Sequence, residues 1–333
     1  MALRLLAKTL RARREFFPGD GHVGAEMMDT HDVRVAIFMA LLVASVIGPE
    51  YCVAQSEPAW NAAVAQAAKV APRARVVVLD IGSGRLLASA RLTEAARTLA
   101  EPGSTLKPLV LIGLVASGRW DPNRRIACSR RLRIAGRSLN CSHPAMDPMD
   151  AREALAWSCN TYFAAVGASL KPGELRSLLA PTGLLSQTAL APGEATASFR
   201  DPRTTDETQL TLLGVDGIRV SPLELAEAYR NLAQRLAAHP DDAAAGVVEA
   251  GLADSASFGM AGNASLGGVP VAGKTGTADG AAGAQSHGWF AGLAPAEAPR
   301  VVVVVYLPAG HGADAARVAA ELLGHSPLRL TRR

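Results

Sequence analysis

Strand-forming segments stand at the two ends of this chain, and a long region of helical character separates them. Near the start, 75–81 (RVVVLDI) and 85–91 (RLLASAR) flank Gly82-Ser83-Gly84, the pattern of two strands joined by a tight turn. Further strands are predicted at 269–278, 287–293 and 300–307. One antiparallel sheet can form only if the first pair joins the last three across the helical region. The sequence therefore predicts an α+β fold, with a five-stranded antiparallel sheet flanked by helices and an all-helical insertion.

Helical patterns account for most of the remaining chain. The longer helices are predicted at 104–117, 150–170, 222–238 and 313–323. Ahead of the first strand, the Ala-rich stretch 56–74 is predicted to be a short helical linker. We therefore expect a main domain over 75–325, preceded by this linker and by a basic segment with a leader at 1–55.

The leader centres on an uninterrupted apolar run at 35–48 (VAIFMALLVASVIG), preceded by Arg34. The run is shorter than the ~20 residues that a membrane-spanning helix needs, and it suits the apolar core of a signal peptide. Met27 or Met28 is an alternative start that would give a leader of ordinary length. A cleaved signal peptide and an uncleaved membrane anchor both remain open. Either one places the main domain outside the cytoplasm, in the periplasm or another extracytoplasmic space.

The net charge of +4 is unevenly distributed, because arginines cluster between 119 and 137. This cluster is either a solvated basic face or a surface that attracts anionic lipid headgroups or wall polymers. No nucleic-acid-binding motif accompanies it, and aromatic residues make up only 5% of the chain. We therefore exclude nucleic acid as a partner.

Cys128 and Cys141 flank two short strand patterns around a turn at Ala135-Gly136. In an oxidising compartment they could form a cross-strand disulfide, and the alternative is two separate buried thiols. A zinc site built from these two residues and His143 would lack a fourth ligand. The sequence alone therefore assigns no metal and no cofactor.

A first candidate for chemistry is EPGSTLKP at 101–108, where Pro102-Gly103 ends an extended segment and Pro108 suits a first helical turn. Lys107 then lies one turn after Ser104, on the same helix face. A serine hydroxyl is a weak nucleophile, and a neutral amine beside it can accept its proton. A serine at a helix N-terminus also offers its backbone N–H to an oxyanion.

Two further short segments complete the set of candidates. In ALAWSCNTYF, Ser158 could relay a proton and the amide of Asn160 could hold a substrate backbone group. In GVPVAGKTGTA, Lys274 would add a second positive charge that keeps Lys107 neutral. The remaining residues of that strand contribute space and hydrogen-bonding groups. Gly276 leaves room for a substrate strand, Thr275 and Thr277 can receive a carboxylate, and the N–H of Thr277 is a second oxyanion donor.

S-x-x-K, S-x-N and K-T-G in this order resemble the signature set of the penicillin-binding transpeptidase family. EPGSTLKP looks like that family's EPGSTFKP, GWFAGLAP is similar to its WFVG-x-AP strand, and DGIRVSPLELAEAYRNLA resembles its G…TPLQLA-x-AYA helix. The resemblance extends from about Val76 to Leu323. It implies the β-lactamase/transpeptidase-like fold, peptidoglycan stem peptides ending in D-Ala-D-Ala as substrates, and β-lactam antibiotics as covalent inhibitors.

The roles that the resemblance implies are those of a serine D,D-transpeptidase, with D,D-carboxypeptidase activity as a variant outcome. Ser104 is the nucleophile, Lys107 the general base and Ser158 the proton relay. Lys274 supports the electrostatics of the site. The substrate is contacted by Asn160, Thr275, Gly276 and Thr277.

Two other functions remain open at this stage. A serine β-lactamase would need a residue such as a glutamate to activate water, and Glu194 follows Ser158 at a suitable distance, although APGEAT also resembles a turn of penicillin-binding proteins. A non-catalytic penicillin-sensing or wall-binding domain is the other alternative. Because no glycosyltransferase region is recognised, either a partner glycosyltransferase or a specialised role is expected. His287 is expected to be structural rather than catalytic.

Overall fold

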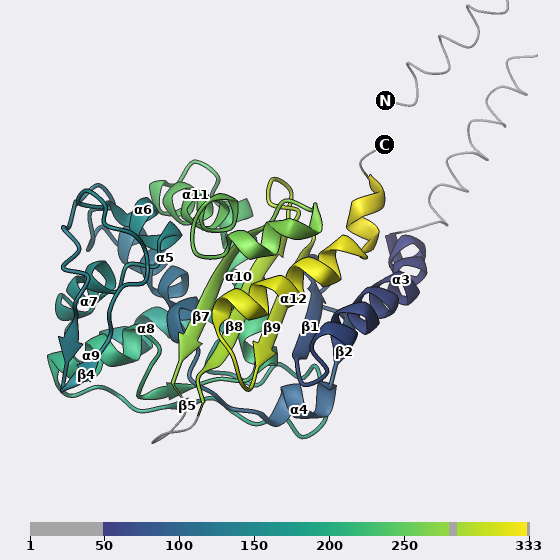
Figure 1. Ribbon diagram of the computed structural model, residues 1–333, viewed down its shortest axis with the longest axis horizontal. Coiled ribbons are helices and arrows are strands. Elements are labelled where there is room, and N and C mark those ends of the chain that lie inside the picture. The colour runs from purple at the N-terminus through teal and green to yellow at the C-terminus, as the bar shows by residue number, and fades with distance from the viewer. Residues whose placement is uncertain (1–48, 280–284, 332–333) are drawn as a thin grey trace, which may run out of the picture. The chain divides into compact units, whose positions relative to one another are not determined.

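One antiparallel sheet joins the two ends of the chain, in the strand order β2-β1-β9-β8-β7 (Figure 1). This computed structural model describes residues 49–279 and 285–331, with side chains from 57 to 329. The strands are β1 (Arg75–Asp80), β2 (Leu86–Ala90), β7 (Ala272–Ala278), β8 (His287–Ala294) and β9 (Val301–Leu307). The first pair joins the last three through β1 and β9, where Val77 lies opposite Val304. The predicted fold class is confirmed.

The central strand β9 consists almost entirely of valine and is buried along its whole length. Successive side chains of a strand point to opposite faces, so neighbouring valines belong to different cores. Val302 and Val304 pack on the face covered by α5 (Lys107–Ala116) and α10 (Pro222–Ala238). Val303 and Val305 pack on the opposite face, with α12 (Gly312–Gly324). The sheet is therefore covered by helices on both faces.

The helix over Pro49–Val70, α3, takes up most of the stretch predicted as a short linker. Its Trp60, Ala63 and Ala67 are buried in the same core as Val76 and Val78 of β1. This segment is therefore packed against the sheet. The predicted leader at 35–48 lies outside the described residues. Within the described part of the chain, no helix has the length and apolar character needed to cross a membrane.

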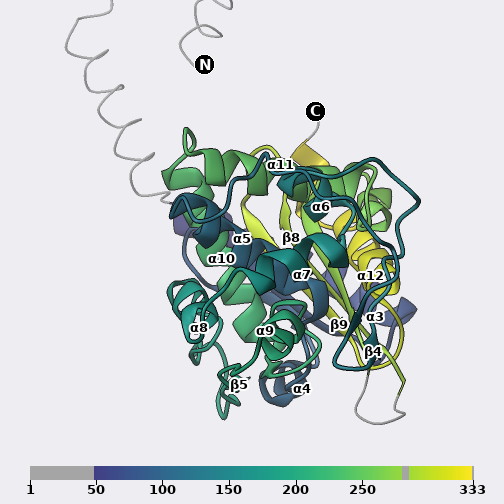
Figure 2. The ribbon, with the colours of Figure 1, turned by 90° about the vertical axis from the view of Figure 1, so that its left-hand side faces the viewer.

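The helical insertion contains more elements than the sequence predicted. The helices α5, α6 (Ala151–Ala156), α7 (Asn160–Ala168), α8 (Glu174–Leu179) and α9 (Thr205–Leu212) gather beside the β7 end of the sheet (Figures 1 and 2). The predicted single helix over 150–170 is wrong, since it is divided into α6 and α7. Helices α4 (Leu92–Arg97), α8, α9 and α11 (Ala243–Ser257) were not predicted.

Short elements connect these helices. Single 3₁₀ turns are η1 (Gly103–Leu106), η2 (Ala180–Thr182), η3 (Gly262–Gly267) and η5 (Pro327–Thr331). The hairpin predicted between the two cysteines is confirmed as β3 (Arg133–Ile134) and β4 (Arg137–Ser138), and a second short pair is β5 (Ser198–Phe199) and β6 (Ile218–Arg219). At the first hairpin turn, Ala135 and Gly136 both have positive φ, as a two-residue turn of primed type requires.

Candidate active site

The turn that carries Ser104 is fixed against the sheet from two sides. The carbonyl oxygen of Glu101 accepts hydrogen bonds from Nε2 of His287 (2.9 Å) and Nε1 of Trp289 (2.8 Å), both on β8. On the other side, the hydroxyl of Tyr229 on α10 donates to the carbonyl of Thr105 over 3.0 Å. His287 is buried in this contact, which gives it a structural role. Ser104 is thereby held in a defined place at the end of β7.

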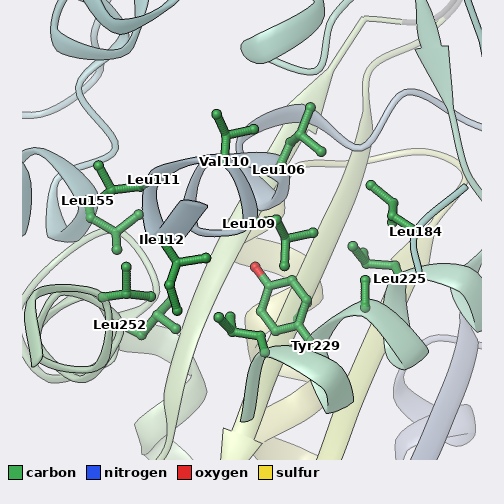
Figure 3. Close-up of a cluster of buried hydrophobic side chains, with 14 of the residues drawn as sticks. Leu106, Leu109, Val110, Leu111, Ile112, Leu155, Leu184, Leu225, Tyr229 and Leu252 are labelled. Carbon is green, nitrogen blue, oxygen red and sulfur yellow. The ribbon is translucent and has the colours of Figure 1, made fainter. Parts of the chain in front are cut away.

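Helix α5 continues directly from this turn and is buried on nearly every side. Figure 3 shows Leu109 lying against Tyr229 of α10, while Ile112 points toward Leu252 of α11. Pro108 occupies the first turn of the helix, where backbone N–H groups have no intrahelical partner, so its missing N–H costs no hydrogen bond. A helix that is apolar all round belongs in a core, so Lys107 at its start is drawn fully into the protein.

The buried ammonium or amine of Lys107 is surrounded by groups of the SCN segment. Its Nζ donates to the side-chain oxygen of Asn160 (2.7 Å) and to the carbonyl of Ser158 (2.9 Å), and it lies 3.3 Å from the hydroxyl oxygen of Ser158. Two carbonyl acceptors use the two hydrogens of a neutral amine. The Ser158 hydroxyl can accept the third hydrogen of an ammonium or turn away from a neutral amine, so this arrangement accommodates both charge states of the lysine.

Burial lowers the pKa of Lys107 from 10.5 to about 8, against an opposing electrostatic influence of Cys159 and Cys141, whose thiolate charge would raise it. Lys274 on β7 is also fully buried, and its pKa is lowered well below 10.5 by burial first and by the charge of Lys107 second. The main cause for Lys107 is thus desolvation, and burial and a second positive charge are the two causes that the sequence suggested. Either way, Lys107 reaches its basic form near neutral pH.

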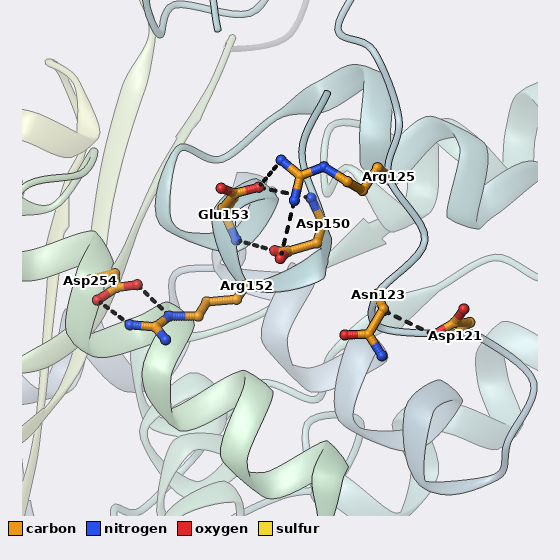
Figure 4. Close-up of polar contacts among 7 residues, drawn as sticks. All are labelled: Asp121, Asn123, Arg125, Asp150, Arg152, Glu153 and Asp254. Atoms are coloured by element: carbon orange, nitrogen blue, oxygen red, sulfur yellow. Dashed lines mark hydrogen bonds and ion pairs between the residues drawn. The ribbon is translucent and has the colours of Figure 1, made fainter. Parts of the chain in front are cut away.

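Ser158 lies in the break between α6 and α7 and has a φ of 56°, in the left-handed region. A non-glycine residue in this region costs about 1–2 kcal/mol, so the surrounding structure must impose it. At α6, Asp150 and Glu153 form a reciprocal N-terminal cap, and Arg125 pairs with both carboxylates (Figure 4). The start of α6 is therefore anchored upstream of Ser158.

A second contact secures the same short helix from the other side. Arg152 of α6 makes a two-point ion pair with Asp254 of α11, at 2.6 and 3.1 Å (Figure 4). The two helices also approach closely, because a Cβ on Gly251 of α11 would lie 2.9 Å from a methyl carbon of Leu155. α6 is thus tied to the core on both sides, which fixes the position of the SCN turn.

The three motif segments meet at a pocket of about 230 Å³. Of the eight predicted site residues, five line it, namely Ser104, Ser158, Asn160, Thr275 and Thr277. Lys107 and Lys274 lie behind this lining, fully buried. The pocket thus presents hydroxyl and amide groups at its surface and buried amines beneath.

Strand β7 borders the pocket as the edge strand of the sheet. A Cβ on Gly103 would come 2.8 Å from the backbone nitrogen of Thr277, so that N–H lies next to the Ser104 turn. The Thr277 side-chain oxygen accepts from the N–H of Gly312 at 2.9 Å, which leaves the hydroxyl hydrogen available to a ligand. An edge strand with such groups can receive an extended peptide as an additional strand.

Gly276 has a structural role that the sequence did not indicate. A Cβ at this position would lie 2.4 Å from the carbonyl oxygen of Pro102 and 3.1 Å from the methyl of Thr105. The missing side chain makes room for the Ser104 turn itself, which packs directly on β7. Close approach of the nucleophile's backbone to the strand therefore depends on this glycine.

Asn160 also has more partners than the sequence indicated. Its oxygen accepts from Lys107, and its Nδ2 donates to the carbonyl of Leu139 at 3.1 Å, in the loop after the β3–β4 hairpin. Strand β4 and this loop supply pocket-lining residues that sequence reasoning missed: Arg137, Ser138, Leu139, Asn140 and Ser142. No local motif marks them, although Arg137 belongs to the basic cluster.

Glu194 does not belong to this pocket lining. Its carboxylate accepts from the backbone N–H groups of Thr188 (2.8 Å), Ala189 (3.1 Å) and Ala191 (2.7 Å), all within its own loop. Burial alone would raise its pKa, but these hydrogen bonds outweigh burial and lower it. A carboxylate committed to its own turn in this way is not placed to activate water beside Ser104.

A family model described as the penicillin binding protein transpeptidase domain matches residues 74–325. The chain belongs to this family. Two solved structures share the fold of this chain. The transpeptidase domain of penicillin-binding protein 3 from Burkholderia pseudomallei superposes with a TM-score of 0.72 at 22% identity, covering 84% of this chain and 95% of that one. A peptidoglycan glycosyltransferase from Burkholderia ambifaria gives a TM-score of 0.69 at 21% identity, covering 81% and 94%.

Family membership implies a serine acyl-transfer enzyme, and the geometry described above is consistent with that class. The protein contains a serine at a helix start, a buried lysine with a lowered pKa, and a polar pocket at a sheet edge. Peptidoglycan peptides and β-lactams are ligands that fit this family.

Proposed function

We propose that this protein is a penicillin-binding serine D,D-transpeptidase that acts on stem peptides ending in D-Ala-D-Ala through an acyl-enzyme at Ser104. The observation that carries the proposal is the position of Lys107. It is fully buried, has a pKa of about 8, and lies one turn after Ser104 with its Nζ against Ser158 and Asn160. A lysine in this state can take a proton from a serine hydroxyl near neutral pH.

In the proposed acylation, neutral Lys107 accepts the hydroxyl proton as Oγ of Ser104 attacks the carbonyl carbon of the penultimate D-Ala. The N–H groups of Ser104 and Thr277 stabilise the negative charge on the carbonyl oxygen. The proton then passes through the Ser158 hydroxyl to the nitrogen of the leaving D-Ala, and the peptide bond breaks. The product is an ester between Ser104 and the shortened peptide.

In the second half-reaction an amine of another stem peptide attacks this ester. Lys107 and Ser158 remove a proton from the attacking amine and return one to Oγ of Ser104, which releases the cross-linked peptide. Attack by water instead would give carboxypeptidation. Substrate positioning is proposed to use β7, with the peptide as an added strand and its terminal carboxylate at Thr275 and Thr277.

The location and partners of the enzyme are also part of the proposal. The substrate lies outside the cytoplasm, and the apolar run at 35–48 suits export as a secreted or membrane-anchored protein. Glycan strands would be supplied by a separate glycosyltransferase. Arg137, on the pocket wall, would attract the anionic groups of wall peptides.

The test is to incubate the purified full chain with a stem pentapeptide ending in D-Ala-D-Ala, with and without an acceptor amine. We expect D-Ala release in both cases and a cross-linked product with the acceptor. Ser104→Ala should release none, while Ser117→Ala, a matched change at the exposed end of α5, should act like the wild type. Stable penicillin labelling without D-Ala release would favour a sensor, and rapid penicillin hydrolysis would favour a β-lactamase.

A further inference from the structure

Three cysteines and one histidine that are separated in the sequence come together next to the pocket. They are Cys128, Cys141, His143 and Cys159, the last of which belongs to the SCN segment. One ligand atom from each residue lies within 4.8 Å of all the others. The sulfur atoms of Cys128 and Cys141 are 3.3 Å apart, and those of Cys141 and Cys159 are 3.9 Å apart. Cys159 is thus the fourth candidate ligand. The zinc site considered from the sequence, with Cys128, Cys141 and His143, lacked one.

His143 supplies an independent indication that a ligand belongs here. The side chain is 1% exposed, and its Nδ1 lies 2.7 Å from the carbonyl oxygen of Pro144, to which it donates. That bond fixes the tautomer, so Nε2 carries a lone pair. Nε2 is buried and has no hydrogen-bond partner. A histidine that donates one ring N–H to a backbone carbonyl and keeps the other nitrogen free is the usual arrangement of a metal ligand.

The sulfur atoms are surrounded by donors that suit thiolates. The backbone N–H of Arg130 donates to Cys128 over 3.3 Å, and the N–H of Asn160 donates to Cys141 over 3.2 Å. Hydrogen bonds of this kind favour the charged form of an acceptor, and metal sites commonly contain them. The site is closed as well, because Cys141 and Cys159 are buried.

A disulfide between Cys128 and Cys141 explains less of this arrangement. It would use two of the four groups and leave the Cys159 thiol and the orphaned Nε2 of His143 unexplained. In a tetrahedral zinc site with Zn–S bonds near 2.3 Å, two sulfurs lie about 3.8 Å apart. The observed separations of 3.3 and 3.9 Å lie on either side of that value and are well above a covalent S–S bond.

We propose that Cys128, Cys141, His143 and Cys159 bind one Zn²⁺ ion in a closed structural site beside the catalytic pocket. Binding converts the three thiols to thiolates, releases their three protons and engages the lone pair of His143 Nε2. Four protein ligands leave no position for water, so the ion takes no part in the reaction.

The position of the site defines what the ion would do. Cys159 lies between Ser158 and Asn160, while Cys141 and His143 belong to the loop that forms one wall of the pocket. The bridge between Ile126 and Met149 closes that loop at its base. A cross-link through zinc would therefore hold the pocket wall against the SCN turn and support the unfavourable φ of Ser158.

The first experiment measures metal content in the full chain, purified without chelator. We expect one zinc per chain by mass spectrometry of the elements, falling to background in Cys128→Ser and His143→Ala. Ser129→Ala, next to a ligand, and His239→Ala, an exposed histidine, should keep the full amount. Ser104→Ala should also retain its zinc, which separates this site from the proposed catalysis.

Two measurements on the wild-type chain avoid dependence on variants that fail to fold. Replacing zinc by Co²⁺ should produce thiolate-to-cobalt charge-transfer absorption and the visible bands of tetrahedral cobalt. After denaturation with chelator, all four cysteines of the chain should react as free thiols. A Cys128–Cys141 disulfide in the purified protein, or four free thiols with no metal bound after addition of Zn²⁺, would overturn the proposal.

The positioning role is tested by removing zinc from the wild-type chain with a chelator and then restoring it. The rate of penicillin labelling should fall on the order of tenfold or more when the site is emptied, because small displacements of catalytic groups are costly. The rate should recover with added Zn²⁺. An unchanged rate in stripped, folded protein would contradict the positioning role.

Discussion

The rate at which Ser104 is acylated should depend on pH through the protonation of Lys107. Only the neutral amine can accept the serine proton, and burial lowers the pKa of this lysine from 10.5 to about 8. The folded protein therefore reaches the active form well below the pH at which a solvated lysine loses its proton. The acylation rate should rise with pH, pass its half-maximal value near pH 8 and then level off.

The size of the effect follows from the titration of one group. With a pKa of about 8, roughly a tenth of the molecules carry neutral Lys107 at about pH 7 and roughly nine tenths at about pH 9. The second-order rate constant for acylation should thus increase about tenfold over this interval and little beyond it. An unshifted lysine would instead give a continued rise of about tenfold for each pH unit, with no plateau below about pH 10.

The assay is the rate of labelling by a fluorescent penicillin, with the fold checked at each pH by circular dichroism. Ser104→Ala serves as the blank, and Lys107→Met should slow labelling by about 10²–10⁴-fold at every pH. A flat profile between neutral and alkaline pH, or a rise without a plateau in folded protein, would refute the assignment of Lys107 as a buried general base.

Three further changes have definite expected outcomes. Gly276→Ala places a Cβ 2.4 Å from the carbonyl oxygen of Pro102, so the rate of penicillin labelling should fall. The free energy of unfolding, measured in urea, should fall by about 1–3 kcal/mol. A variant with wild-type values would contradict the close packing. Glu194→Gln should leave the lifetime of the penicillin label unchanged, whereas a much longer lifetime would reveal a hydrolytic role. Trp60→Ala should lower the free energy of unfolding by about 3–5 kcal/mol, since this buried ring packs α3 on the sheet. A negligible change would mean that α3 is a dispensable linker.

The parts of the fold that could be predicted are those with strong local patterns. The valines of β9 mark a strand buried on both faces, and helix α10 begins where its sequence indicates, with Ser221 as cap, Pro222 at the first position and Glu224 completing the box. Helix α11 was missed because its Ala-rich sequence has little contrast between faces. Tertiary packing stabilises it, which a local pattern does not report.

The candidate site shows the same division between local and tertiary information. Ser104 and Lys107 could be placed because one helical turn relates them. The break at Ser158 could not, since no glycine or proline marks its positive φ and anchors on α6 impose it. The reason for Gly276 and the approach of Cys159 to the other cysteines depend on segments that meet only in the folded chain.

The central claim is that Ser104 forms a covalent acyl-enzyme, and intact mass spectrometry with benzylpenicillin tests it most directly. The full chain should gain the mass of one complete penicillin, the adduct should map to the peptide that contains Ser104, and Ser104→Ala should gain nothing. An adduct on another residue, an equal adduct on Ser104→Ala, or no adduct on folded wild-type protein would contradict the account.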